Sequence, residues 1–384
     1  MNLGDYAGRL LGQCVGQQKG EKWKVMRSHF DPEYSHQAST DMIPIFSKEI
    51  DIWTEGLARG PQGNASIGGT SVQDVMHVSK VLALRLIALT MYGEALDEEK
   101  YARLMELSLL HGVLTKNAIL NLRLTSKWYN MLPITPRFQM NAFQKRWEHF
   151  NTDMISHART KRITCPAERI YKGVEMGQMS KTEYLQTLDE MLFTNIDITG
   201  SVLGFIFVNM ASKNSFQEKL RAEVVGQKQQ ESYSIANYVA KQDSLLHYAT
   251  LESLRISPAL SFSPPECTAS EKVISGYHIP PKTPTVIDVR RLNTYPELWA
   301  PDPDEFRPER FENLAPSRYR YGLLRWGIGP GKCMGKNMAD LLLKMTVSAV
   351  LERYSLSPAK AVDEKSGIKP GPGPAPTPIN FKRI

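Results

Sequence analysis

Residues 326–335 read WGIGPGKCMG, which places one cysteine, Cys333, among four glycines and a proline. The stretch NMADLLLKMTVSAVLERY follows, and its apolar residues recur at the three- and four-residue spacing of a helix. The other cysteines, Cys14, Cys165 and Cys267, are far apart and form no CxxC pair, which argues against a disulfide framework and a structural zinc site. A cysteine of this chain that does chemistry is therefore expected to act as a single thiolate.

The composition is that of a globular protein with a sizeable core. The chain has 384 residues, of which 42% are hydrophobic and 23% charged. Its net charge of +7 allows an acidic partner, but the basic residues form no long run, so nucleic acid binding is not expected. No signal peptide is visible, and the apolar run VSKVLALRLIALTMYG is interrupted by Lys80 and Arg85. We expect this run to be a buried or amphipathic helix and the chain, as written, to be soluble.

The pattern along the chain predicts one helix-rich domain. Apolar residues at helical spacing extend from Val72 to Lys127, and a second helical region follows from QMNAFQKRW to VNMASK. From about Ser257 prolines multiply, and short β-prone pieces such as KVISGYHIP and TPTVIDVR lie between turn residues. We therefore expect residues 1–384 to form a single α+β domain, mainly helical, with small sheets.

Three further stretches have spacings that indicate a site. In LESLR, Glu252 and Arg255 lie three residues apart, so on a helix they share a face and can pair. In FRPERF, Arg310 lies in a proline-bounded loop that could bring a second guanidinium to the same carboxylate. FTNIDITG places polar residues in the middle of a long apolar helix. Each feature alone is weak, because such pairs are common on solvated helix faces.

In this order and spacing, the four stretches resemble the cytochrome P450 family of haem-thiolate monooxygenases, from about residue 20 to the C-terminus. The residues that carry the resemblance are Glu252 and Arg255 of an ExxR motif, Arg310 of a PERF motif, and Gly329, Cys333 and Gly335 of the haem loop. The resemblance implies the cytochrome P450 fold and haem b as cofactor. The alternative for Cys333, a structural cysteine in a turn, does not account for the other motifs.

The resemblance also implies a role for each part of the haem loop. Cys333 would be the axial thiolate ligand of the haem iron, which favours O–O cleavage. Glycines would let the backbone approach the porphyrin, and N–H groups at the helix start would stabilise the negative charge of sulfur. Trp326 takes the place of the usual Phe and keeps an aromatic wall near the thiolate. We interpret Cys14, Cys165 and Cys267 as ordinary thiols.

The haem propionates are expected to depend on a second region, GEKWKVMRSHFDPEYS. Trp23 and Arg27 lie four residues apart, and in the family these positions hydrogen-bond a propionate. The alternative is a packed Trp beside a surface Arg. Two usual propionate-binding arginines are replaced here, one by Gly331 with Lys332 beside it, and one by Glu266. Because a carboxylate would repel a propionate, we expect Glu266 to turn away or the local alignment to slip.

The oxygen-activating helix departs from the family pattern. It reads Thr194-Asn195-Ile196-Asp197-Ile198-Thr199, where many members have Ala/Gly-Gly-x-Asp/Glu-Thr with an acid and an alcohol that relay protons. The acid is kept as Asp197, but Asn195 replaces the Gly and Ile198 replaces the Thr. Asn195 and Thr199 lie four residues apart on one face, so we predict that Thr199, with Asn195 and Asp197, carries the relay. The alternative is that the Thr199 hydroxyl bonds the carbonyl of Asn195 and does no chemistry.

Only 22 residues precede Trp23, whereas the family has a long section there and eukaryotic members add a membrane anchor. We therefore expect an N-terminally truncated cytochrome P450 with uncovered sheet edges and apolar helix faces. Full-length relatives are placed on the cytosolic face of the endoplasmic reticulum membrane. This chain shows no anchor and is expected to be cytoplasmic as written.

The resemblance implies oxidation of an apolar small molecule with O2 and electrons from a separate NADPH–cytochrome P450 reductase, with cytochrome b5 as a further donor. The sequence looks most like fungal family members that tailor secondary metabolites. Basic residues near the cysteine form a candidate docking surface: Arg318, Arg320, Arg325, Lys332, Lys336 and Lys344. Substrate contacts are expected from residues 193–202, 260–263 and 377–379.

Two alternatives stay open. One is a haem-thiolate isomerase or dehydratase that needs no reductase, which Ile198 in place of Thr favours and which a test of NADPH dependence would distinguish. The other is a non-catalytic remnant, which failure to retain haem would indicate.

Overall fold

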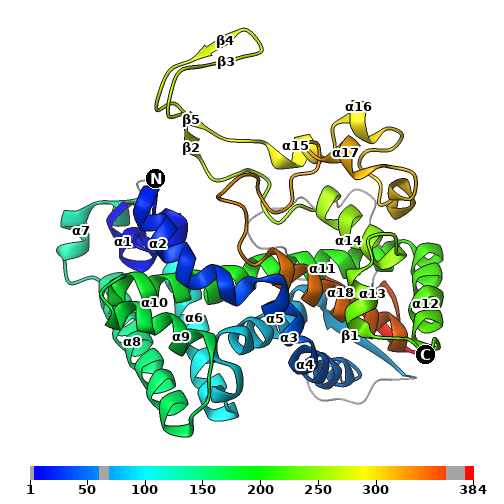
Figure 1. Cartoon of the computed structure of the whole chain (residues 1–384), viewed down its shortest axis with the longest axis horizontal. Helices are drawn as coiled ribbons and strands as arrows, with labels where there is room; N and C mark the ends of the chain where they lie inside the picture. Colours follow the sequence, from blue (N-terminus) through cyan, green and yellow to red (C-terminus); the bar gives the residue numbers. More distant parts are fainter. Residues whose placement is uncertain (1–3, 60–68, 360–376) are drawn as a thin grey trace. The chain divides into compact units, whose positions relative to one another are not determined.

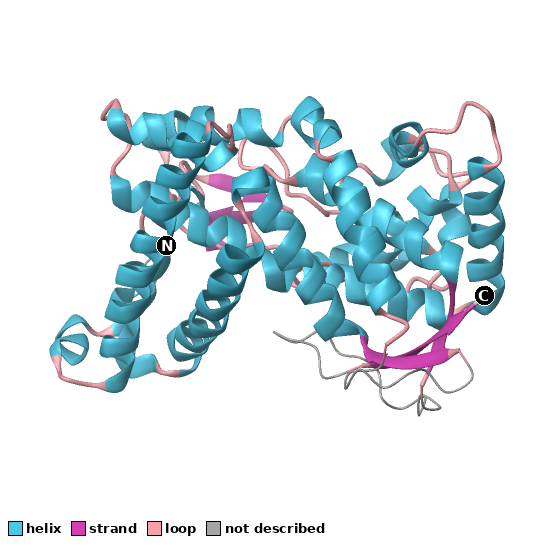
Figure 2. Cartoon of the chain, turned by 90° about the horizontal axis from the view of Figure 1, so that it is seen from below, coloured by secondary structure: helices cyan, strands magenta, loops and turns pink. Residues whose placement is uncertain are grey.

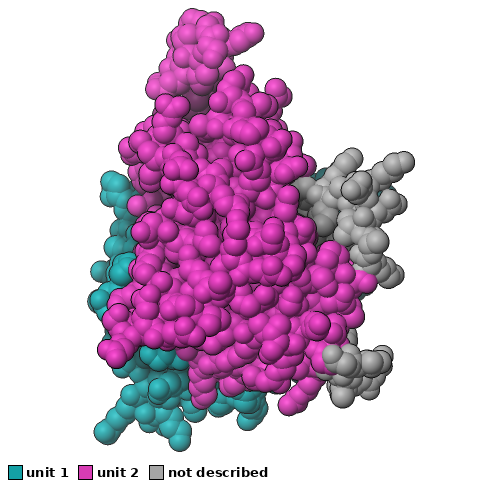
Figure 3. All heavy atoms as spheres, turned by 90° about the vertical axis from the view of Figure 1, so that its right-hand side faces the viewer, with its two compact units in different colours: residues 1–45, 83–197 teal, residues 46–82, 198–384 magenta. Residues whose placement is uncertain are grey.

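The computed structural model describes residues 4–59, 69–359 and 377–384. The chain divides into two compact units, residues 1–45 with 83–197 and residues 46–82 with 198–384 (Figure 3). Helices make up most of the described chain, and the strands are few and short (Figure 2). The predicted fold class, mainly α with small β-sheets, is confirmed.

Within its described residues the first unit contains helices joined by short loops and no strand (Figure 1). Its α-helices are α1 Gly4–Leu11, α2 Gly20–Phe30, α3 His36–Asp41, α6 Glu98–Leu120, α7 Lys127–Met131, α8 Thr135–Lys161, α9 Pro166–Glu175 and α10 Lys181–Asp189. Short 3-10 turns connect them: η1 Val15–Gln17, η2 Asp31–Tyr34, η3 Gly93–Ala95 and η4 Leu122–Thr125. A cluster of aromatic rings fills the core, where Phe143, Trp147 and Phe193 contact one another with ring centroids 5.1 to 6.3 Å apart.

Three helices contain residues of both units: α4 Ile43–Gly56, α5 Val75–Tyr92 and α11 Asn195–Ser212. The remaining helices belong to the second unit: α12 Asn214–Lys228, α13 Ile235–Ala240, α14 Leu245–Ile256, α15 Val289–Asn293, α16 Pro296–Trp299, η6 Pro308–Phe311, α17 Pro316–Tyr319 and α18 Lys336–Arg353. Its largest sheet has the order β1-β7-β6 and is antiparallel, with β1 Thr70–Asp74, β6 Tyr354–Pro358 and β7 Pro378–Arg383.

The start of α5 corrects the sequence prediction. We expected helix from Val72, but residues 70–74 form β1, and Val72 pairs with Asn380 of β7. Asp74 marks the change, because its carboxylate accepts hydrogen bonds from the backbone N–H groups of Met76, at 3.2 Å, and Thr377, at 3.1 Å. One side chain thus starts the helix and joins it to the C-terminal segment.

The predicted β-prone pieces after residue 257 are short strands. β3 Lys272–Ile274 pairs with β4 Tyr277–Ile279 through a two-residue turn, in which Ser275 has φ 52° and Gly276 φ 83°. β2 Glu266–Cys267 pairs with β5 Pro284–Thr285. These strands expose apolar side chains, including Val273 and Tyr277.

Two helical segments are long and apolar enough to cross a membrane by length and composition alone, Val75–Ala95 and Lys181–Ser212. Both are mostly buried inside the structure, 67% and 61%, as core helices are. The first of them is the run that we expected to be a buried or amphipathic helix.

Candidate active site

Backbone geometry makes the Cys333 loop dependent on glycine. Gly327 and Gly329 have φ values of 75° and 76°, in the left-handed region that side-chain-bearing residues seldom adopt. The two glycines let the chain fold back, so that the Cys333 N–H donates to the carbonyl of Trp326 at 2.7 Å. Gly335 then caps the start of α18, where its carbonyl accepts from the N–H of Ala339 at 2.8 Å.

The same loop is open on its outer side. Cys333 is exposed, and a Cβ added to Gly329 or Gly331 would meet no atom within 4 Å. The indole Nε1 of Trp326 is buried but has no hydrogen-bond partner among the described residues. Buried donors normally have partners, so this arrangement fits a group that covers the loop and carries acceptor atoms.

The Glu252–Arg255 pair is completely enclosed. Both side chains are 0% exposed, and the guanidinium of Arg255 donates to both carboxylate oxygens of Glu252, at 2.7 and 2.8 Å. The predicted second guanidinium is present as well, because Arg310 Nε donates to Glu252 Oε1 at 2.9 Å. The N–H of Arg307 donates to the same oxygen, also at 2.9 Å.

Backbone carbonyls complete this cluster. Arg255 donates to the carbonyls of Asn293, Pro303 and Glu305, and its guanidinium lies 5.0 Å from the ring centre of Trp299. Arg310 donates to the carbonyl of Trp299 at 2.9 Å, and burial lowers its pKa. The cluster therefore ties α14 to the segment 293–311 and leaves no donor of Arg255 for a ligand.

A π-helical turn, η5 Glu190–Thr194, separates α10 from α11 at the predicted oxygen-activating stretch. The side-chain amide of Asn195 donates to the carbonyls of Glu190, at 3.3 Å, and Met191, at 3.0 Å. Asn195 therefore stabilises the turn, and its NH2 group is not available to relay protons. The Thr199 hydroxyl has no hydrogen-bond partner in the described part of the chain, so the bond to the Asn195 carbonyl that would have excluded a relay is not formed.

A buried contact between a histidine and an aspartate precedes this turn, and the sequence did not predict it. His111 Nε2 of α6 lies 2.8 Å from Asp189 Oδ1, with side chains 7% and 2% exposed. Burial raises the pKa of Asp189, and the His111 ring stacks on Phe193 at 4.9 Å. The apolar surroundings of Asp189 in LDEMLF were the available indication, because a buried carboxylate needs a partner.

The other cysteines have the character of ordinary thiols. Cys14 and Cys165 are buried, and burial raises the pKa of each thiol. A raised pKa keeps the thiol protonated and unreactive at neutral pH. Cys267 is exposed on β2, in a short strand with no glycine loop and no helix start.

Trp23 and Arg27 share a face of α2, as predicted. The Arg27 guanidinium lies 5.3 Å from the ring centre of Trp23, and its Nε donates to Asp31 Oδ1 at 2.6 Å. Both residues belong to the first unit. Their role toward a propionate stays a prediction, as does that of Glu266, which lies exposed on β2.

The prediction that Lys344 belongs to the basic surface is wrong, because this residue is buried. Lys344 is 0% exposed, and its Nζ lies 2.8 Å from Asp340 Oδ2 and donates to the Val239 carbonyl at 3.0 Å. Arg325 is half-buried, and burial lowers its pKa. The sequence pattern could not reveal this, because Lys344 lies on the face of α18 that packs against α13.

The chain belongs to the cytochrome P450 family, since the family described as Cytochrome P450 matches residues 5–380. It is 51% identical to the cytochrome P450 monooxygenase lepD of Aspergillus flavus, over 93% of this chain and 70% of that protein. It is 40% identical to the cytochrome P450 monooxygenase apdB of Emericella nidulans, over 90% of this chain and 73% of that protein. The crystal structure of CalO2 matches with a TM-score of 0.72 and 19% identity, over 98% of this chain and 82% of that chain, which supports the fold alone.

The chain is thus a cytochrome P450 monooxygenase, an oxidoreductase with a haem-thiolate cofactor. The Cys333 loop fits that cofactor, because it offers an exposed thiol, an open glycine face and a buried indole donor without a protein partner.

Proposed function

We propose that this monooxygenase oxidises an apolar small molecule in fungal secondary metabolism, by hydroxylation, epoxidation or oxidative ring formation, with haem b, O2 and electrons from a separate reductase. The observation that carries the proposal is that Cys333 is exposed in an open, glycine-rich loop shortly before helix α18. The relatives named above, which are monooxygenases of Aspergillus and Emericella, support the fungal context.

The loop's residues would hold the cofactor in distinct ways. Cys333 would ligate the iron, Gly329 and Gly335 would let the backbone lie close to the ring, and Trp326 would offer its indole N–H to an acceptor. When bound, a haem thiolate supplies O2 activation by donating electron density from sulfur. Trp23 and Arg27 would hydrogen-bond a propionate.

The side chains of α11 would contribute to the reaction by passing on protons. The Thr199 hydroxyl can accept a proton from a water molecule and donate its own, because it is bonded to no group of the described chain. Asp197, an exposed carboxylate two residues earlier, can exchange protons with solvent. Asn195 contributes by holding the π-turn that sets the direction of this helix segment.

The test of this relay is Thr199→Val, which keeps the shape and removes the hydroxyl. Product formed per NADPH consumed should fall severalfold, with peroxide released instead, while the haem spectrum stays unchanged. Ser201→Ala, two residues further along the helix, is the control. Unchanged coupling in Thr199→Val would exclude Thr199 as the relay.

The reductase is proposed to dock at the exposed part of the basic surface and to deliver electrons there. Arg318, Arg320 and Lys336 are exposed and have no ion-pair partner within the described residues. An acidic reductase surface docking there would be screened by salt, so turnover should fall as ionic strength rises. Salt-independent turnover would contradict docking at this surface.

A second candidate is a reductase-independent isomerase or dehydratase. Ile198 in the usual place of Thr and the structural use of the Asn195 amide favour it, because both reduce the groups available for proton delivery. Product formation without NADPH or reductase would establish this alternative, and strict dependence on both would exclude it.

A further inference from the structure

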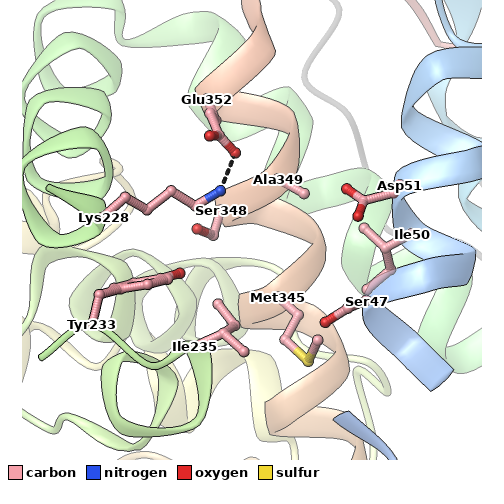
Figure 4. A pocket seen from close by; sticks show the side chains of 10 residues that line it. All are labelled: Ser47, Ile50, Asp51, Lys228, Tyr233, Ile235, Met345, Ser348, Ala349 and Glu352. Atoms are coloured by element: carbon pink, nitrogen blue, oxygen red, sulfur yellow. Dashed lines mark hydrogen bonds and ion pairs between the residues drawn. The ribbon is translucent and has the colours of Figure 1, made fainter. Parts of the chain in front are cut away.

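A small pocket opens on the second unit, and none of the residues that line it belongs to the proposed haem site. Its volume is about 170 Å³, and three segments form it: α4, α18, and the end of α12 with the residues that follow it (Figure 4). Its floor is one face of α18, where Met345, Ser348, Ala349 and Glu352 follow at helical spacing. Ala349 has the smallest side chain of the four.

Ser348 is the feature that indicates a ligand. Its side chain is 1% exposed, and its Oγ has no hydrogen-bond partner among the described residues. The hydroxyl points into the pocket (Figure 4). A buried hydroxyl without a partner costs about 1–3 kcal/mol, so a bound molecule that supplies the partner would recover this energy.

The charges at the rim indicate that the ligand is neutral. Lys228 pairs with Glu352 (Figure 4), and Asp51 pairs with Arg353 at 2.7 Å. Burial raises the pKa of Tyr233, so its hydroxyl stays protonated at neutral pH. Each charged side chain that lines the pocket thus has a partner within the chain, and an ionic ligand would find no unpaired charge among the lining residues.

The size and lining indicate an aromatic ring. A cavity of about 150 Å³ lined by apolar side chains accepts benzene, so this pocket can take one six-membered ring with a substituent. Ile50 and Ile235 supply apolar walls, and the floor adds the thioether of Met345, whose sulfur can contact an aromatic ring favourably. We propose that the pocket binds a neutral aromatic alcohol of the size of phenol, whose hydroxyl donates to Ser348 Oγ.

The test uses phenol as the probe and toluene as the control ligand, which has a methyl group in place of the hydroxyl. Binding to the haem-loaded 384-residue chain is measured by saturation-transfer NMR, with saturating imidazole present so that the haem site is occupied. Ser348→Ala should weaken phenol binding about fivefold and leave toluene unaffected, because it removes one hydrogen bond. Ala349→Leu should abolish binding of both by filling the floor. Ser317→Ala, at an exposed position of α17, is the control and should change neither.

The outcome is decided by the ratio of phenol to toluene affinity. A ratio that falls in Ser348→Ala supports the proposal even if Ala349→Leu lowers the melting temperature. No phenol binding to the unaltered chain, or a ratio equal in the unaltered chain and Ser348→Ala, overturns it. None of these readouts depends on monooxygenase activity, so failure here leaves the proposed function untouched.

Discussion

Two regions of the second unit carry family motifs, and they differ in how completely the chain satisfies them. Around Glu252 and Arg255, side chains are 0% exposed and each oxygen of the carboxylate has a donor within the chain. Around Cys333 the thiol is exposed, glycines face open space, and the indole donor of Trp326 has no partner in the described residues. The polar groups of the Glu252–Arg255 cluster are thus closed off within the chain, whereas the Cys333 loop is open to a bound group.

The difference distinguishes residues that stabilise the fold from residues that are available to bind a cofactor. A closed polar cluster contributes to the fold by itself, and losing one member leaves a buried charge with fewer partners than it needs. An open loop contributes little to stability, and its unsatisfied groups are available to a cofactor. Substitutions in the two regions should therefore affect the free energy of unfolding very differently.

The largest effect is expected from Arg255→Met. It leaves the Glu252 carboxylate buried with only Arg310 as a charged partner, so stability should fall by about 3–5 kcal/mol. The urea midpoint, followed by circular dichroism, measures this fall. Arg307→Met is the matched control, because its side chain is 42% exposed and pairs only at the surface. Equal midpoints for the two variants would contradict the closed-cluster account.

The pH dependence of stability tests the same helix, α14. Burial, with Lys344 and Arg325 nearby, lowers the pKa of His247 to about 4, although Asp340 and Asp243 act in the opposite direction. Between about pH 6.5 and this value the unfolded chain binds a proton and the folded chain does not, so stability falls as pH falls.

His247→Phe should therefore reduce the loss of stability between about pH 7 and pH 4.5 by roughly 2–3 kcal/mol. The measurement is the urea midpoint at the two pH values. His149→Phe, at a side chain that is 71% exposed, should leave the slope as it is. The same slope in both variants would show that His247 titrates normally in the folded chain.

A smaller loss is expected from Lys344→Met, about 1–3 kcal/mol, because the change strands the Asp340 carboxylate and the Val239 carbonyl. Lys336→Met, eight residues earlier on the same helix, is exposed and should change stability by less than about 0.5 kcal/mol. Thermal unfolding compares them. If Lys344→Met is as stable as Lys336→Met, the buried contacts of Lys344 contribute nothing.

The smallest effect on stability is expected from Cys333→Ser. The Cys333 N–H keeps its bond to the Trp326 carbonyl, so the haem-free chain should unfold within about 0.5 kcal/mol of the unaltered one. A loss comparable to that of Arg255→Met would mean that the loop belongs to the closed part of the fold.

The sequence predicts well those features that depend on local spacing. The Glu252–Arg255 pair, the approach of Arg310, the helix after Gly335 and the β-prone pieces near Val273 all follow from residue order. Contacts between distant segments escape such reasoning. The pairing of His111 with Asp189, the burial of Lys344 against α13 and the pairing of β1 with β7 depend on elements brought together only in the folded chain.

Asn195 shows a third kind of limit. Its position predicted correctly that it lies one helical turn from Thr199. The assignment of its amide to proton relay could not foresee that a π-helical turn would expose two carbonyls within its reach. Local breaks in a helix change which backbone groups need hydrogen-bond partners, and the spacing of apolar residues does not predict such breaks.

The central claim is that the open loop around Cys333 holds haem through its thiolate. The most direct measurement is the reduced, carbon monoxide difference spectrum of the 384-residue chain after haem supplementation, beside that of Cys333→Ser. We predict a Soret band at the position of a thiolate-ligated haem in the unaltered chain and its loss in the variant. Absence of that band from the unaltered chain, or the same spectrum in both, would contradict the account.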